Sequence, residues 1–186
     1  MTLPVLHWIP SPNFSSRSGA KVDLLVLHDT EGSYQSAINW FENQASKVSA
    51  HFVLREDGLE ATQMVDIGHK AWHACNANPR SIGFEMAGIA KKGFGAPELA
   101  AAGEVFAFFL HHLQIPLRHA IGGVGPGICS HWELGAMGGG HADPSTNPQF
   151  MDDFFKHVTE MYHFGDFPPI WEPGNESGKP CLLRPA

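Results

Sequence analysis

The order of hydrophobic and polar positions in the first half of the chain predicts alternating strands and helices. Residues 22–28 (VDLLVLH) form a nearly unbroken apolar run, which is typical of a strand buried on both faces. After Ser33, a favoured capping residue, apolar side chains recur at helical spacing as far as residue 45. Residues 51–55 and 60–65 then flank an Asp-Gly turn, which predicts a β-hairpin.

The second half of the chain predicts one more strand and two helices. In residues 81–88 (SIGFEMAG), apolar residues alternate with Ser, Gly and Glu, so the two kinds of side chain lie on opposite faces of a strand. Residues 97–114 open with Pro-Glu and carry an apolar stripe, which predicts a long helix. A last helix begins after Asn147, with Pro148 at its first position. This order predicts an α/β fold: a central mixed β-sheet flanked by helices.

The two ends of the chain are rich in proline and lack periodicity. Residues 1–20 contain three prolines and several serines, so we expect an irregular lead-in. Residues 164–186 contain five prolines and are too short for a second domain, so we expect a C-terminal tail. One domain over residues 1–163 is therefore expected, in line with the total length of 186 residues.

Composition and charge narrow the classes of partner. The chain has 12 Lys and Arg residues against 19 Asp and Glu residues, so its formal charge is −7 with histidine neutral. No run of basic residues offsets this charge locally, and such a chain repels nucleic acid. The longest apolar run, residues 105–110, is far shorter than the roughly 20 residues that span a bilayer. We expect neither nucleic-acid binding nor membrane insertion.

Cysteine usage and the start of the chain bear on where the protein is made. The three cysteines show no CxxC spacing, which argues against a disulfide framework or a cysteine-rich zinc site. The first Lys or Arg is Arg17, so no basic segment of the kind that opens a secretory signal is present. We expect a monomer without a signal peptide, made in the cytoplasm.

Histidine is unusually frequent, with 12 residues, as many as Lys and Arg together. His28 ends the first apolar strand, where the catalytic groups of α/β proteins gather, although a core histidine hydrogen-bonded to the backbone is the favoured interpretation of this residue taken alone. His131 ends another short apolar segment, and His141 and Asp143 follow in a glycine-rich loop. Two histidines and a carboxylate, with an open position for water, form the ligand set of a catalytic zinc site. A flexible surface loop explains the spacing of His141 and Asp143 equally well.

Glu85 is the one charged residue of the strand predicted over residues 81–88. Two interpretations are open. A carboxylate near a metal-activated water accepts a proton as a general base, whereas an ordinary strand carboxylate faces solvent.

Five segments, in this order, resemble the zinc-dependent N-acetylmuramoyl-L-alanine amidases of the amidase-2 family, to which the peptidoglycan recognition proteins belong. The segments are VLHDTEG (26–32), VSAHFVLREDG (48–58), AWHA (71–74), NPRSIGFEMAG (78–88) and SHWELG…GGGHADP (130–144). The resemblance implies that family's fold and the hydrolysis of the amide bond between N-acetylmuramic acid and L-alanine in peptidoglycan.

Carried over by position, the resemblance implies one Zn²⁺ bound by His28, His131 and Asp143. Glu85 falls at the position of the family's catalytic acid. Many members have a lysine where this chain has His141, which is therefore expected to act as a catalytic donor to the oxyanion. Some phage members place a catalytic tyrosine where this chain has Ala50, so the proton transfer is assigned to Glu85.

His73 and Asn78 occupy loop positions that resemble the family's substrate cleft. The resemblance implies that they bind the peptidoglycan or muropeptide substrate, although His73 as a residue that anchors the loop is an alternative. We expect a phage endolysin that reaches the cell wall through holin-type release. A cytoplasmic amidase that recycles anhydromuropeptides and a non-catalytic peptidoglycan-binding module are the alternatives.

Overall fold

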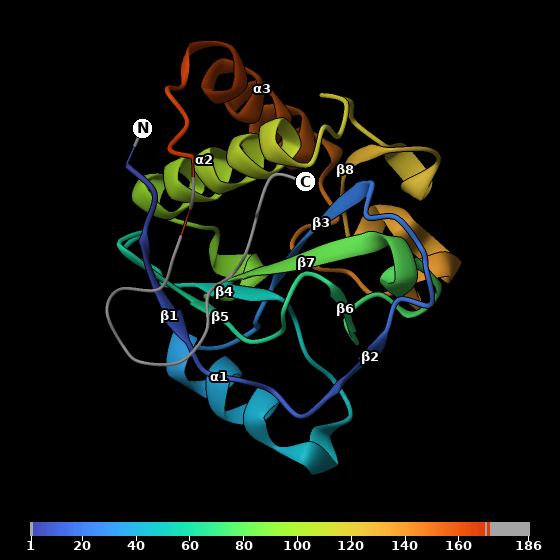
Figure 1. Ribbon diagram of the computed structural model, residues 1–186. Coiled ribbons are helices and arrows are strands. Elements are labelled where there is room, and N and C mark those ends of the chain that lie inside the picture. Colours follow the sequence, from blue (N-terminus) through green and yellow to red (C-terminus); the bar gives the residue numbers. More distant parts are fainter. Residues whose placement is uncertain (1, 170, 172–186) are drawn as a thin grey trace.

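A six-stranded mixed sheet forms the centre of the molecule, with α1 on one side and α2 and α3 on the other (Figure 1). The computed structural model describes residues 2–169 and 171. The predicted α/β class is confirmed. The strands, in their order across the sheet, are β1 (Val5–Trp8), β5 (Glu60–Gln63), β4 (Phe52–Leu54), β7 (Ser81–Met86), β3 (Leu24–Asp29) and β8 (Gly127–Ser130).

Strand direction brings the candidate site residues to one edge of the sheet. The predicted hairpin is confirmed, because β4 and β5 pair antiparallel, with Phe52 opposite Gln63. Every other pairing in the sheet is parallel. The central strand β3 lies between β7 and β8, so the carboxyl ends of these three strands meet, and His28 is the register partner of Glu85.

The three predicted α-helices are present. Helix α1 (Tyr34–Glu42) begins after Ser33, whose hydroxyl accepts from the Ser36 N–H. Helices α2 (Ala96–His112) and α3 (Pro148–Phe164) complete the set, and Asn147 caps α3. Helix α1 ends before the predicted residue 45, because Asn43 caps a separate 3-10 turn over Gln44–Ser46. Among the described residues, no helix is both long and apolar enough to cross a bilayer.

The main hydrophobic core lies between one face of the sheet and the helices α2 and α3. As the alternation predicted, Ile82, Phe84 and Met86 of β7 point into this core. Burial of these large side chains provides the main driving force that holds the helices on the sheet. The largest buried contributors from the other elements are Leu6, Leu25, Leu27, Phe52, Phe106, Phe108 and Phe109.

The predicted lead-in over residues 1–20 is wrong, because two strands form there. Strand β1 pairs parallel with β5, and β2 (Phe14–Ser16) pairs antiparallel with β6 (His69–Ala71), which was also not predicted. Pro4 and Pro10 flank β1 and do not interrupt it, and β1 is an edge strand, where nearby proline is tolerated.

Part of the predicted tail packs on the core. The indole of Trp171 is buried, stacks on Phe52 with ring centroids 5.4 Å apart, and donates a hydrogen bond of 2.8 Å to the Pro4 carbonyl. The boundary of the predicted domain at residue 163 falls one residue before the end of α3. Most of the predicted tail, residue 170 and residues 172–186, lies outside the described residues.

Candidate metal centre and active-site cleft

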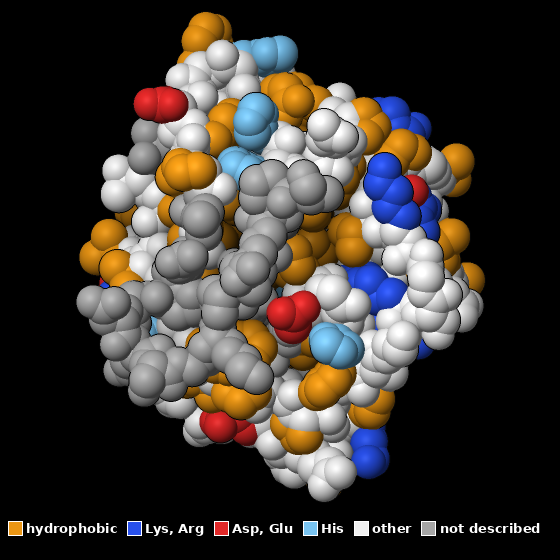
Figure 2. Space-filling model, in the orientation of Figure 1, with side chains coloured by type: hydrophobic (Ala, Val, Ile, Leu, Met, Phe, Trp, Pro, Cys, Tyr) orange, Lys and Arg blue, Asp and Glu red, His pale blue; other side chains and the backbone are white. Residues whose placement is uncertain are grey.

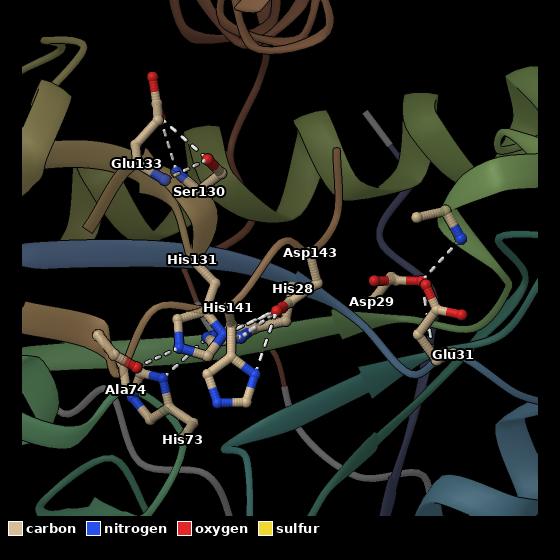
Figure 3. A network of polar contacts seen from close by, with 12 residues as sticks. His28, Asp29, Glu31, His73, Ala74, Ser130, His131, Glu133, His141 and Asp143 are labelled. Atoms are coloured by element: carbon tan, nitrogen blue, oxygen red, sulfur yellow. Dashed lines mark hydrogen bonds and ion pairs between the residues drawn. The ribbon is translucent and has the colours of Figure 1, made fainter. Parts of the chain in front are cut away.

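Three side chains predicted to bind zinc converge at the carboxyl ends of β3 and β8 (Figure 3). The Nδ1 atoms of His28 and His131 lie 3.0 Å apart. Asp143 Oδ2 lies 3.1 Å from each of these nitrogens. One candidate ligand atom from each of the three residues falls within 4.8 Å of the others. The loop that carries Asp143 is therefore folded back onto the sheet edge.

Backbone contacts explain how the loop reaches this place. The His131 N–H donates to the Leu27 carbonyl at 3.0 Å, which extends the β3–β8 pairing by one residue. The Trp132 N–H donates to the Asp143 carbonyl at 2.8 Å and ties the far end of the loop to its start. Gly138 is required here, since a Cβ at this position would lie 2.9 Å from the His131 ring.

The turn after β8 has its own support. The Glu133 carboxylate accepts from the Ser130 N–H at 2.9 Å and from the Ser130 hydroxyl (Figure 3). His119 Nε2 lies 2.7 Å from the same carboxylate, on its other oxygen. These contacts fix the residues on both sides of His131.

The ionisation of the three residues suits a divalent cation. Burial lowers the pKa of His28 to about 4, so its imidazole is neutral at neutral pH. Burial alone would raise the pKa of the Asp143 carboxyl, but the contacts with His131 and His28 outweigh it and hold that pKa well below the usual range. His131 Nε2 donates to the Gly138 carbonyl at 2.8 Å, so Nδ1 is the ring nitrogen that faces His28 and Asp143. Two imidazole nitrogens and an ionised carboxylate are ligands that Zn²⁺ prefers.

Glu85 lies next to this centre and is not the solvent-facing residue that one interpretation allowed. Its side chain is 8% exposed and lines the cavity described below. Burial, followed by the charges of Asp143 and Asp29, raises the pKa of Glu85 well above its usual value. A buried carboxyl with a raised pKa beside a cluster of candidate metal ligands is typical of an acid–base catalyst.

A cavity of about 480 Å³ opens over the metal centre. Its walls include His28, Glu85 and Asp143 together with the aromatic side chains of Trp40 and Trp72. Trp40 is 55% exposed, so its indole is accessible from solvent. A concave site with apolar walls and a few convergent polar groups is the form that ligand-binding sites take.

His141 lies at the rim of the metal centre. Its ring stacks on the His131 ring, with centroids 4.5 Å apart and planes at 14°. Its Nδ1 lies 3.8 Å from Asp143 Oδ1, and its side chain is 61% exposed. The structure thus brings His141 to the cleft, with a ring edge open to solvent.

The two predicted substrate-binding residues lie in different places. His73 lines the cavity, and its Nδ1 lies 2.9 Å from His28 Nε2. Burial lowers the pKa of His73 well below its usual value, so the ring is neutral. Asn78 lies behind His73 and is not part of the cavity wall. Its side-chain oxygen accepts from the N–H groups of His73 and Ala74, at 3.1 and 2.6 Å, and so holds their loop.

Two polar residues near the centre were not singled out from the sequence. Asp29 Oδ2 accepts from the Ala90 N–H at 3.0 Å, and burial raises the pKa of this carboxyl to about 7. Ser81 contacts His73 and shares a strand face with Glu85. Position in the sequence offered a signal for both, since Asp29 follows His28 directly and Ser81 lies four residues before Glu85.

Other histidines gather away from the cleft. Figure 2 shows histidine side chains over α2 and α3, the helices that carry His111, His112 and His163. No chemistry is assigned to His111 and His112, which lie on α2, on the opposite side of the sheet from α1 and the cleft (Figure 1).

Comparison with known proteins identifies relatives of this chain. A sequence model described as N-acetylmuramoyl-L-alanine amidase matches residues 18–146, which include the three candidate ligands and Glu85. N-acetylmuramoyl-L-alanine amidase A of Achromobacter lyticus is 42% identical over 85 residues, which cover 45% of this chain and 48% of that protein. The match thus spans about half the length of this curated relative.

The fold is shared with solved structures of other proteins. The Staphylococcus aureus hydrolase AmiA, solved in complex with its ligand, has a TM-score of 0.73 at 18% identity, over 91% of this chain and 89% of that one. The endolysin N-acetylmuramoyl-L-alanine amidase LysCS of Clostridium intestinale has a TM-score of 0.63 at 14% identity, over 85% of this chain and 97% of that one. At this level of identity the likeness extends to the fold alone.

Proposed function

Since the chain belongs to the N-acetylmuramoyl-L-alanine amidase family, we propose that it is a zinc-dependent hydrolase. Its substrate is peptidoglycan or a muropeptide, and the scissile bond is the amide between N-acetylmuramic acid and L-alanine. The observation that carries this proposal is the convergence of His28, His131 and Asp143 beside the buried Glu85, at the floor of an open cavity.

His28, His131 and Asp143 would hold a single Zn²⁺. When bound, Zn²⁺ lowers the pKa of water and polarises the carbonyl that is attacked. The three side chains fit this ion because two of them are imidazoles held in a buried site and the third is an ionised carboxylate.

Glu85 would move the proton. Its carboxylate takes a proton from the attacking water and returns it to the nitrogen of the departing alanine. The raised pKa of Glu85 supports this role, because a catalytic acid–base works best when its proton affinity matches the working pH. Its burial keeps competing water away from the transferred proton.

His141 would stabilise the negative charge that develops on the attacked carbonyl oxygen. Stacking on His131 keeps its ring at the centre, and its exposed edge is free to meet the substrate. His73 would contact the substrate from the cavity wall, whereas Asn78 would act indirectly through its hydrogen bonds to the loop.

For the biological role, we favour a monomeric phage endolysin that lyses cells after holin-type release. The motivation for this choice is that a Clostridium intestinale protein of the same fold is named an endolysin; the fold itself is common to both roles. A cytoplasmic recycling amidase would carry out the same bond cleavage on soluble anhydromuropeptides, so the size of the preferred substrate separates the two roles.

The test is digestion of purified sacculi, with the new amino termini identified by mass spectrometry. We expect peptides that begin with alanine, loss of the activity after treatment with a chelator, and recovery after Zn²⁺ is added back. New termini at an internal residue of the stem peptide would indicate a peptidase instead. Binding to sacculi without any released peptide would indicate a non-catalytic module. Faster turnover of soluble anhydromuropeptides than of sacculi would favour the recycling role.

A further inference from the structure

A chain of hydrogen bonds leads from the metal centre into the sheet through His73. His28 Nε2 lies 2.9 Å from His73 Nδ1, and His73 Nε2 lies 3.0 Å from the Ser81 hydroxyl. That hydroxyl lies 2.8 Å from the Ala77 carbonyl. These contacts therefore link His28, through His73 and Ser81, to a backbone acceptor.

The direction of every hydrogen bond in this chain is fixed by its last member. A carbonyl oxygen only accepts, so Ser81 donates its single hydroxyl hydrogen to Ala77. Ser81 can then only accept from His73, which places the ring hydrogen of His73 on Nε2. A neutral imidazole carries one such hydrogen, so His73 Nδ1 has a free lone pair and accepts a hydrogen bond from His28 Nε2. The other ring nitrogen of His28, Nδ1, consequently carries a lone pair, on the side that faces His131 and Asp143.

The residues of strand β7 leave room for this chain of hydrogen bonds. Ser81, Gly83 and Glu85 occupy the same face of the strand, since alternate residues point the same way. A Cβ at Gly83 would lie 2.6 Å from the ring of His73, so only glycine leaves room for the imidazole. One strand face thus supplies the hydroxyl, the space for the ring and the acid–base carboxyl.

We propose that His73 and Ser81 are positioning residues that hold His28 in the tautomer able to bind zinc. The proposal rests on the zinc site of the proposed function. A metal-binding histidine is usually oriented by a hydrogen bond from its other ring nitrogen to a carboxylate or a carbonyl, as His131 is by Gly138. For His28 a second imidazole takes that place, and its own orientation depends on Ser81.

The test compares Ser81→Ala, His73→Phe, His73→Gln and Gly83→Ala with His111→Gln, a control on the surface of α2. The first readout is the dissociation constant for Zn²⁺, measured by competition with a chromophoric chelator. We expect Ser81→Ala, His73→Phe and Gly83→Ala to bind zinc roughly 10–100-fold more weakly. His73→Gln should recover most of the affinity, because its amide oxygen accepts from His28 Nε2 and its amide nitrogen donates to Ser81.

The second readout is the tautomer of His28, measured by ¹⁵N–¹H NMR on the metal-free protein. We expect the hydrogen on Nε2 in the wild type and a mixture of tautomers in His73→Phe. A hydrogen on Nδ1 of His28 in the wild type would overturn the proposal. So would a His73→Gln variant that binds Zn²⁺ as weakly as His73→Phe does. Because this readout needs no metal, it tests the tautomer independently of the zinc site. The proposed zinc site is contradicted by a different result, namely a wild-type protein that does not bind Zn²⁺.

Discussion

The two faces of the central sheet use the same strands for opposite purposes. In β7, Phe84 points toward α2; its ring stacks on Phe52 and packs at a tilt against Phe106, with ring centroids 4.9 and 4.8 Å away. The adjacent Glu85 points toward the metal centre, and Gly83 on the other side of Phe84 leaves a space that His73 fills. We call the face toward α2 and α3 the packed face and the face toward the metal centre the site face. Side chains on the packed face contribute through the volume that they fill, whereas side chains on the site face contribute through polar atoms at defined positions.

This difference teaches that residues adjacent in sequence should respond to mutation in different ways. Loss of volume on the packed face removes contacts and leaves a cavity, which lowers the free energy of unfolding. Loss of a polar atom on the site face removes a group needed for catalysis or metal binding. The strand itself remains paired on both sides, with β3 and β4. Stability and activity should therefore separate along a single strand.

The largest expected effect is on the site face. The substitution Glu85→Gln keeps the size of the side chain but removes its ability to accept a proton. We expect kcat/KM for peptidoglycan hydrolysis to fall roughly 10²–10⁴-fold, the usual contribution of general acid–base catalysis. The free energy of unfolding should not decrease, because a buried ionisable group is replaced by a neutral one. Activity close to that of the wild type would show that another residue transfers the proton.

The second-largest expected effect is a loss of stability after a substitution on the packed face. Phe106 of α2 is fully buried against Phe84 and Phe154. We expect Phe106→Ala to lower the free energy of unfolding by about 3–5 kcal/mol in urea denaturation, because truncation of a buried phenylalanine leaves a cavity. The affinity of the folded fraction for Zn²⁺ should stay that of the wild type.

A matched control for this variant lies at the end of α3. Phe164 is 87% exposed, so Phe164→Ala should change the free energy of unfolding by less than about 0.5 kcal/mol. If Phe106→Ala weakened zinc binding as much as it weakened folding, the two faces would not be energetically separate.

The packed face could be predicted from sequence because its signal is local. Alternation in residues 81–88 assigned Phe84 and Glu85 to opposite faces, and the apolar stripe in residues 97–114 identified α2. The caps at Ser33 and Asn147 were also predicted, since capping depends on residues within one turn.

Features that depend on distant partners could not be predicted in this way. Strand β1 has four residues and gains its hydrogen bonds from β5, whose residues follow more than 50 positions later. A pattern within so short a segment carries no information about that partner. The contact between His28 and His73 spans 45 positions, so only the folded chain reveals it. The resemblance to known amidases supplied the ligand assignment that spacing left open.

The smallest expected effect concerns a polar group on the packed side of the molecule. Glu98, in the first turn of α2, is only 2% exposed. Its Oε1 atom is buried without a hydrogen-bond partner in the described part of the chain. Burial, followed by the charge of Glu56 and more weakly those of Asp29 and Asp57, raises the pKa of Glu98 from 4.5 to about 8. The folded protein therefore binds this proton more tightly than the unfolded chain does.

The sign of the pH dependence follows from this shift. The stability that protonated Glu98 contributes is complete below about pH 4.5 and is lost as the pH rises through about 8. Glu98→Gln keeps the shape and removes the titration, so at pH 9 we expect the variant to be more stable than the wild type by on the order of 3 kcal/mol. The measurement is urea denaturation from pH 5 to 9, with Glu160→Gln on the surface of α3 as the control. Parallel curves for the wild type and Glu98→Gln would mean that the packed face tolerates a carboxylate without cost, and the contrast between the two faces would then rest on volume alone.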